Sequence, residues 1–238
     1  MKFNLLFITL LFFCFTGCSQ VNSIDLPDKY PIIPVPNEIS YGKDEIQFES
    51  VNIVSNDFKN EGNILANFFK KKDINSSEKG LYIQLKKEKI SVDGNNEEAY
   101  KLSVSDCIVI VANSDKGIYY GIQTLKQLFR KNKTKAVFPK VEIKDFPVFI
   151  IRGFMHDTGR NFQSVAQLKE QIEILAQYKY NVFHWHLTDN PGWRLESKIY
   201  PELQSKEATT RQKGNFYTQE DFKAILAFCK ERKITVIP

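Results

Sequence analysis

Apolar and polar positions along residues 41–147 follow two different periods. Alternation with a period of two indicates strands, and apolar residues three and four apart indicate one buried helix face. Gly121 falls inside the second expected helix and costs about 1 kcal/mol relative to alanine, so we expect this helix to approach a sheet closely there. The pattern predicts strands over 46–55, 81–85, 100–104 and 107–112, and helices over 61–72 and 118–129.

From residue 148 onward, short apolar runs alternate with helical patterns. Strands joined by helices are typical of parallel β-sheets, in which each strand is followed by a helical crossover. Residues 141–147 are expected to join this part to the preceding domain. We expect strands over 148–156, 181–187 and 234–238, and helices over 164–178 and 218–232.

Polar side chains gather where the first two of these strands end. In parallel α/β folds, binding and catalytic groups lie at the carboxyl ends of the strands. This clustering indicates a functional site built from His156, Asp157 and Arg160 after the first strand and from His184, His186 and Asp189 after the second.

Five motifs in this region resemble family 20 glycoside hydrolases, the β-N-acetylhexosaminidases. The motifs are Arg152-Gly153, residues 157–162 (DTGRNF), residues 184–189 (HWHLTD), residues 192–196 (GWRLE) and residues 200–203 (YPEL). The resemblance extends from about Pro31 to the end of the chain. It implies an α/β protein with a small α+β N-terminal domain over 31–147, followed over 148–238 by the first strands and helices of an incomplete (β/α)8 TIM barrel.

The resemblance also implies a reaction. Family 20 enzymes remove terminal β-linked N-acetylglucosamine or N-acetylgalactosamine from glycans by substrate-assisted retaining catalysis, without a cofactor. Their catalytic Asp-Glu pair follows the fourth barrel strand and has no match here, so we expect it beyond Pro238 and expect this chain alone to be inactive. A non-catalytic glycan-binding surface lipoprotein is the alternative.

Arg152 is the first candidate for substrate binding. It lies among apolar residues, where an unpaired guanidinium is costly. A planar fork of donors suits neighbouring sugar hydroxyls, and the resemblance implies such a contact. The alternative is a structural ion pair, for instance with Asp157, which is itself a substrate-binding candidate or a partner of Arg160.

His186, Asp189 and Trp193 complete the predicted substrate-binding set. His184 and His186 are two residues apart and therefore face the same side of a strand. They could contact the sugar, be buried structural residues, or form a metal site with Asp189 in a metal-dependent hydrolase; we predict no metal. Trp193 could stack on a sugar face or fill the top of the barrel.

The first 18 residues have the layout of a lipoprotein signal peptide. Lys2 precedes an apolar run over residues 5–15, which is too short to span a bilayer comfortably. Residues 15–18 (FTGC) resemble a lipoprotein box, with Cys18 as the lipidated residue, although an ordinary secretory signal is also compatible. Residues 19–30 then form a tether, and we expect a lipid-anchored protein of the cell envelope.

Composition and charge indicate a globular protein. Hydrophobic residues make up 42% of the chain and the formal net charge is +5. The basic clusters at 70–72 and 130–133 lie near predicted helix ends, where cations offset the helix dipole, so we predict no nucleic-acid partner. Cys107 and Cys229 lie far apart and are expected to be free thiols.

Overall fold

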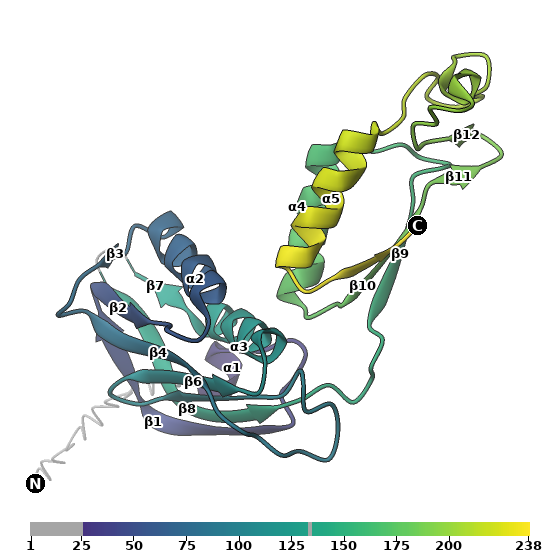
Figure 1. Ribbon diagram of the computed structural model, residues 1–238. Helices are drawn as coiled ribbons and strands as arrows, with labels where there is room; N and C mark the ends of the chain where they lie inside the picture. The colour runs from purple at the N-terminus through teal and green to yellow at the C-terminus, as the bar shows by residue number, and fades with distance from the viewer. Residues whose placement is uncertain (1–25, 133–134) are drawn as a thin grey trace, which may run out of the picture.

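The computed structural model describes residues 26–132 and 135–238. Within these ranges the chain forms two larger sheets, each covered by helices, and a small two-stranded hairpin sheet (Figure 1). Cys18 and the predicted signal peptide lie outside the described residues. No helix in the described part is long and apolar enough to cross a membrane.

The N-terminal sheet is mixed, with the strand order β1-β8-β5-β6-β4-β2-β3 and with β7 paired to β8. A short helix α1 (Leu26–Lys29) precedes it. The strands are β1 (Glu38–Phe48), β2 (Ser50–Val54), β3 (Asn75–Ser76), β4 (Leu81–Lys87), β5 (Tyr100–Val104), β6 (Ile108–Ala112), β7 (Arg130–Lys131) and β8 (Ala136–Asp145).

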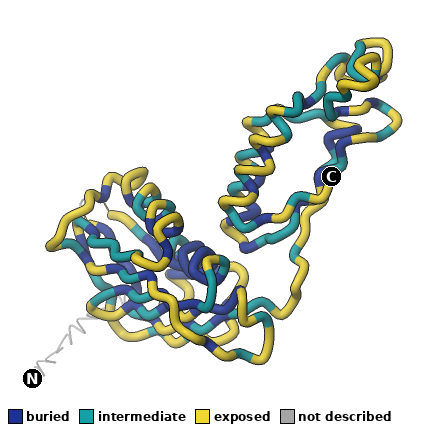
Figure 2. The backbone as a smooth tube through the Cα atoms, viewed as in Figure 1, coloured by how far each residue is buried: buried dark blue, intermediate teal, exposed yellow. Residues whose placement is uncertain are grey.

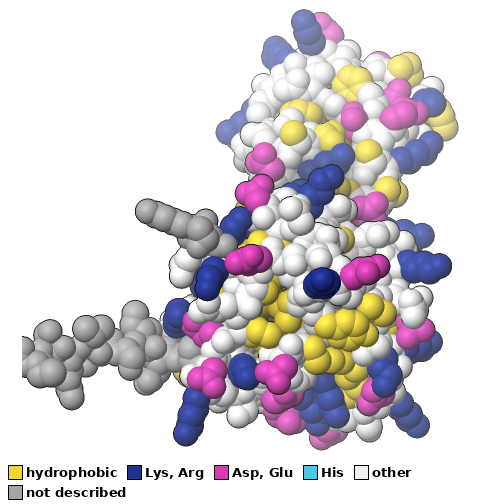
Figure 3. Space-filling model, turned by 90° about the vertical axis from the view of Figure 1, so that its left-hand side faces the viewer, with side chains coloured by type: hydrophobic (Ala, Val, Ile, Leu, Met, Phe, Trp, Pro, Cys, Tyr) yellow, Lys and Arg dark blue, Asp and Glu magenta, His cyan; other side chains and the backbone are white. Residues whose placement is uncertain are grey.

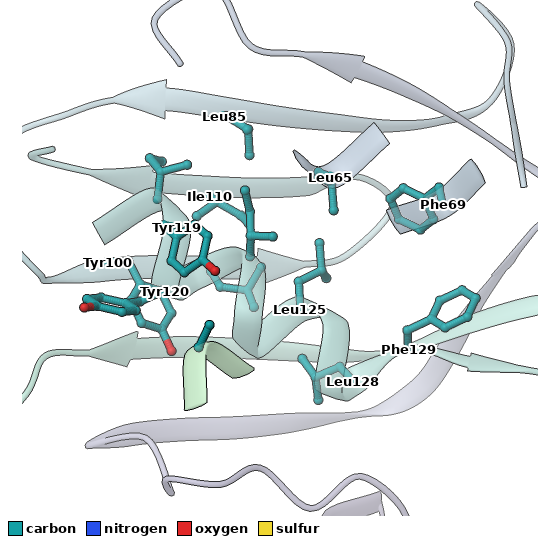
Figure 4. Packing of buried hydrophobic residues seen from close by; sticks show 14 of the residues in the cluster. Leu65, Phe69, Leu85, Tyr100, Ile110, Tyr119, Tyr120, Leu125, Leu128 and Phe129 are labelled. Carbon is teal, nitrogen blue, oxygen red and sulfur yellow. The ribbon is translucent and has the colours of Figure 1, made fainter. Parts of the chain in front are cut away.

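Two helices, α2 (Lys59–Lys71) and α3 (Asp115–Leu128), lie against this sheet. Their inward residues, including Leu65, Phe69 and Leu125, are buried in a single apolar core with the sheet (Figure 4). The predicted close contact at Gly121 is confirmed, because a Cβ there would lie 2.6 Å from a methyl group of Ile110 on β6. A side chain at this position would therefore have to displace Ile110.

The second sheet is parallel, in the order β13-β10-β9, as predicted. Its helices pack on each other. Its elements are β9 (Gly153–Asp157), α4 (Val165–Gln177), β10 (Val182–His186), the hairpin β11 (Thr188–Asp189) and β12 (Gly192–Trp193), the 3-10 helix η1 (Pro201–Gln204), α5 (Gln219–Glu231) and β13 (Thr235–Ile237).

Both helices of this part begin with the local signals that the sequence carries. Ser164 and Gln167 form a capping box at α4, and Thr218 and Asp221 form one at α5. In each box the hydroxyl accepts from a backbone N–H and the second side chain accepts from the cap N–H, which satisfies donors that the first turn leaves open. Both helices start within one residue of the positions that these signals predicted.

Three boundary predictions were wrong. Residues 46–55 form the end of β1 and all of β2 rather than one strand, and residues 141–145 belong to β8 rather than to a linker. Residues 148–152 are not part of β9. Their side chains from Val148 to Ile151 are more than 70% exposed, and Figure 2 shows this connecting segment as exposed.

The two parts meet through buried ion pairs. Lys179 follows α4 in a left-handed conformation (φ 62°) and its ammonium lies 2.8 Å from Asp145 at the end of β8. Lys233 follows α5 in a similar conformation (φ 60°) and pairs with Glu61 and Asp115 of the N-terminal helices. The two positions that end successive helices therefore fasten the parallel sheet to the N-terminal domain.

Candidate functional site

Asp157 and His186 are paired neighbours at the carboxyl ends of β9 and β10. The following residues turn inward over this edge, since Thr158 and Gly159 both donate their backbone N–H to the carbonyl of His186 at 3.0 Å. The predicted meeting of the two strand ends is therefore observed. It brings together Asp157, Arg160, His186 and Asp189, which we call the strand-end cluster.

Arg160 is the centre of the strand-end cluster. Its Nε lies 3.3 Å from the Asp157 carboxylate and one terminal nitrogen lies 2.9 Å from the Asp189 carboxylate. His186 Nε2 lies 3.2 Å from the same Asp189 oxygen. The Arg160 side chain is 61% exposed, so its planar donors are held in place by two carboxylates and remain accessible from solvent.

The Asp189 carboxylate is held in its ionised form. The backbone N–H of Asn190 and the imidazole of His186 bond to it, and together with the charge of Arg160 they lower the pKa of Asp189 below its usual value. The Asp189 carboxylate can accept a hydrogen bond from one hydroxyl, and the Arg160 guanidinium beside it can donate to the neighbouring hydroxyl. The arrangement suits a vicinal diol such as a sugar presents.

A buried arginine supports the loop that carries Asp189. Arg194 is 0% exposed and its guanidinium donates to four main-chain carbonyls, those of Gly159, Arg211, Gln212 and Asn215. Arg194 joins the loops after β9 and β12 to residues 211–215. These hydrogen bonds hold the loops that carry Arg160 and Asp189 of the strand-end cluster.

Arg152 does not belong to the strand-end cluster. It precedes β9 and lies at the opposite end of that strand, where it donates to Glu98 (2.6 Å) and to the carbonyls of Phe149 and Lys179. All three guanidinium nitrogens are engaged. The structural ion pair that we gave as the alternative is present, although its partner is Glu98 and not Asp157, and Arg152 is therefore not carried into the proposed sugar site.

The residues that could form a metal site differ from those of the metal-site alternative. Among the residues that the structure describes, the ligand atoms close enough to share an ion belong to Asp157, His186 and Asp189. His184, which the hypothesis required, is not among them and lies exposed on β10. Arg160 already bonds both carboxylates, and a positive guanidinium at this place opposes a cation.

Trp193 is 42% exposed on β12, directly opposite Thr188 in the hairpin. The buried tryptophan of this region is Trp185 instead, which is 0% exposed, stacks on Phe222 of α5 and donates its indole N–H to Thr158 at 3.0 Å. An indole face is therefore accessible on the loop that also carries Asp189.

Arg160 is the functional candidate that the sequence reasoning undervalued. It was named as part of the expected functional site but not among the predicted substrate-binding residues. The signal that could have identified Arg160 is its position three residues after the end of β9. A side chain there can reach over the carboxyl edge of the sheet, whereas Arg152 lies at the start of the same strand. The strand direction alone separates the two arginines.

Comparisons with known proteins agree along the whole described chain. A family model described as "Glycosyl hydrolase family 20, domain 2" matches residues 29–146, and one described as "Glycosyl hydrolase family 20, catalytic domain" matches residues 149–238. A β-hexosaminidase of Porphyromonas gingivalis is 34% identical over 252 residues, which cover 93% of this chain and 32% of the relative. A β-hexosaminidase of Vibrio furnissii is 40% identical, covering 60% of this chain and 26% of the relative.

A solved structure gives the same result. The family 20 exo-β-N-acetylglucosaminidase from Vibrio harveyi, in complex with N-acetylglucosamine, superposes with a TM-score of 0.76 at 33% identity, covering 88% of this chain and 36% of that one. This chain spans about a third or less of the length of these relatives. The predicted fold class is confirmed, with an α+β domain followed by the first strands and helices of a TIM barrel that is not closed within the described residues. The chain belongs to glycosyl hydrolase family 20.

Proposed function

We propose that this protein is a β-N-acetylhexosaminidase that removes terminal N-acetylglucosamine or N-acetylgalactosamine from glycans. The observation that carries the proposal is the strand-end cluster, in which Arg160 is held between Asp157 and Asp189 at the carboxyl edge of a parallel sheet. The names of the relatives support it, as does the N-acetylglucosamine in the Vibrio harveyi structure.

Within this proposal each member of the cluster has a separate role. Arg160 donates to neighbouring hydroxyls of the terminal sugar, and Asp189 accepts from one of them. Asp157 orients Arg160 through its bonds to the backbone N–H and to Nε. His186 fixes the Asp189 oxygen that faces Arg160, and the exposed face of Trp193 stacks on the C–H face of a sugar.

The reaction we propose is substrate-assisted. The acetamido oxygen of the substrate attacks the anomeric carbon, a glutamic acid protonates the leaving group, and an aspartate orients the acetamide. No residue pair in these 238 residues matches these two carboxylates, so the residues of this chain bind and orient the sugar without supplying the proton. We propose that the 238 residues by themselves bind N-acetylhexosamine and do not hydrolyse it.

We also propose that the protein is attached to the cell envelope by a lipid on Cys18, which lies outside the described residues. Metabolic labelling with a radioactive fatty acid tests this. Incorporation that is lost in Cys18→Ser supports the anchor, whereas equal labelling of both proteins, or labelling of neither, contradicts it.

Activity is tested with 4-nitrophenyl N-acetyl-β-glucosaminide, offered to the complete gene product. Release of nitrophenol supports the enzymatic proposal, and its absence contradicts it and leaves glycan binding without chemistry.

In parallel, calorimetry measures N-acetylglucosamine binding by the 238-residue chain, by Arg160→Lys and by the matched control Arg211→Lys. We expect weaker binding only in Arg160→Lys, because an ammonium cannot reproduce the planar fork of donors.

A further inference from the structure

A polar cavity of 380 Å³ lies where the helices of the two parts converge. The residues that line it include Phe68 of α2, Gln123, Lys126 and Gln127 of α3, Arg130 shortly after α3, and Glu173 of α4. The volume falls in the range of about 300–1,000 Å³ that small-molecule sites occupy. It shares no residue with the strand-end cluster, so a ligand here would be recognised independently of the proposed sugar site.

Gln123 is the most informative residue of this cavity. It is 1% exposed, and neither its side-chain nitrogen nor its oxygen has a hydrogen-bond partner among the described residues. Gln127, one turn later on α3, shows the contrast, since its amide bonds to both main-chain groups of Ile33 and to the carbonyl of Gln177. Buried amides are ordinarily satisfied in this way, so Gln123 offers an unused donor and an unused acceptor.

Lys126 adds an unpaired positive charge. Its ammonium lies 5.7 Å from the centre of the Phe68 ring, and burial lowers its pKa. No carboxylate of the described residues lies within 4.0 Å of it, because Glu173, the acid of this cavity, is bonded to Arg232 at 2.7 Å. A desolvated ammonium gains most from a partner of opposite charge.

The amide of Gln123 and the ammonium of Lys126 would therefore bind two different chemical groups of one ligand. An amide that donates and accepts is matched by a hydroxyl, which does the same. An ammonium is matched by a carboxylate, and the ring of Phe68 offers an apolar surface to carbon-bound hydrogens. We propose that this cavity binds a small hydroxylated carboxylate of the sugar-acid class, with its carboxylate on Lys126 and a hydroxyl on Gln123.

The test uses sodium glucuronate as the probe and the melting temperature of the whole chain as the readout. Glucose supplies the hydroxyls without the charge, and inorganic phosphate supplies charge without the sugar ring. The variants are Gln123→Met, Lys126→Met and the matched control Gln127→Met. We expect glucuronate to raise the melting temperature of the wild type, and to do so more than glucose or phosphate at the same concentration.

The variants separate a binding role from a structural one. Gln123→Met removes unpartnered polar atoms, so we expect it to melt at a higher temperature than the wild type without probe, and to lose the glucuronate response. Lys126→Met loses the response as well. Gln127→Met, which breaks existing bonds, melts at a lower temperature and is expected to keep a response.

Four results would overturn the proposal. They are no response to glucuronate, an equal response to glucose or to phosphate, a response that persists in either Gln123→Met or Lys126→Met, and a Gln123→Met protein that melts as low as Gln127→Met. The last would show that the Gln123 amide is satisfied in solution. Arg160→Lys, which alters the strand-end cluster, is expected to leave the glucuronate response unchanged, so failure here and failure of the proposed activity are distinguishable.

Discussion

The guanidinium of Arg152 lies 2.6 Å from the carboxylate of Glu98. Arg152 immediately precedes the first strand of the parallel sheet, and Glu98 precedes β5 of the N-terminal domain, 54 residues earlier in the chain. Asn181, at the start of the next parallel strand, reaches the same glutamate and accepts from the Arg152 backbone N–H. The amino ends of β9 and β10 are thus held by the domain beneath them, while their carboxyl ends remain free for the strand-end cluster.

Breaking this ion pair should reduce stability and spare sugar binding. Both side chains are mostly buried, so Arg152→Met leaves Glu98 as an unpaired buried charge, at a cost of about 3–5 kcal/mol in the free energy of unfolding. Urea denaturation measures this, and calorimetry with N-acetylglucosamine checks that binding is unchanged. A loss of binding without loss of stability would mean that Arg152 contacts the sugar after all.

The imidazole of His156 should make stability depend on pH. Burial lowers its pKa below the ordinary value of 6.5, so the unfolded chain takes up a proton at a higher pH than the folded one. Stability is therefore full above pH 6.5 and falls as the pH drops from there through the lower folded pKa. Denaturation between pH 8 and pH 5 should show a smaller decline in His156→Gln than in the wild type.

The exposed His184 provides the matched control for that experiment. His184→Gln removes an imidazole from the neighbouring strand, where the side chain is in contact with solvent. We expect its pH dependence to follow the wild type. A decline that is equally reduced in both variants would show that burial of His156 is not the cause.

Two glycines of α3 should differ in their tolerance of alanine. A Cβ at Gly121 meets a methyl group of Ile110 at 2.6 Å, and one at Gly117 meets the carbonyl oxygen of Ala99 at 2.3 Å. A side-chain methyl can shift more easily than the backbone carbonyl of Ala99, which directly precedes β5. Overpacking of about 1–3 kcal/mol should therefore outweigh the gain in helix propensity more clearly at Gly117. Thermal unfolding of Gly117→Ala and Gly121→Ala tests the order, and the reverse order contradicts it.

Asp189→Asn should weaken sugar binding and disturb Arg160. The substitution keeps the shape and removes the charge that holds Arg160 and His186. Because hydrogen bonds to charged groups are stronger than those to neutral ones, we expect the dissociation constant of N-acetylglucosamine to rise by roughly 10-fold. Glu196→Gln, whose carboxylate accepts from the Gln219 backbone outside the cluster, should change it little.

Local signals in the sequence were sufficient for the helices and for the direction of the parallel strands. The capping boxes at Ser164 and Thr218 and the spacing of apolar residues need no knowledge of the rest of the fold. The strand β8 was missed because Lys140, Glu142 and Lys144 interrupt its apolar pattern. One face of that strand is polar, and only its pairing with β1 and β5 reveals it.

The sequence predicted where the candidate site lies but not every residue that forms it. Strand ends indicated Asp157, His186 and Asp189, because the position of a strand end is a local property. The partner of Arg152 lies 54 residues away, and the partners of Arg194 are main-chain carbonyls. Neither set of partners can be read from side-chain patterns, so the ion-pair partner suggested for Arg152 was wrong and the contacts of Arg194 were not predicted.

The most direct test of this account is the position of N-acetylglucosamine bound to the chain, determined by crystallography. We expect a sugar whose neighbouring hydroxyls contact the Arg160 guanidinium and the Asp189 carboxylate, with Trp193 against its C–H face and with the Arg152–Glu98 pair unchanged. A sugar bound away from Arg160 and Asp189, or no binding at millimolar concentrations, would contradict it.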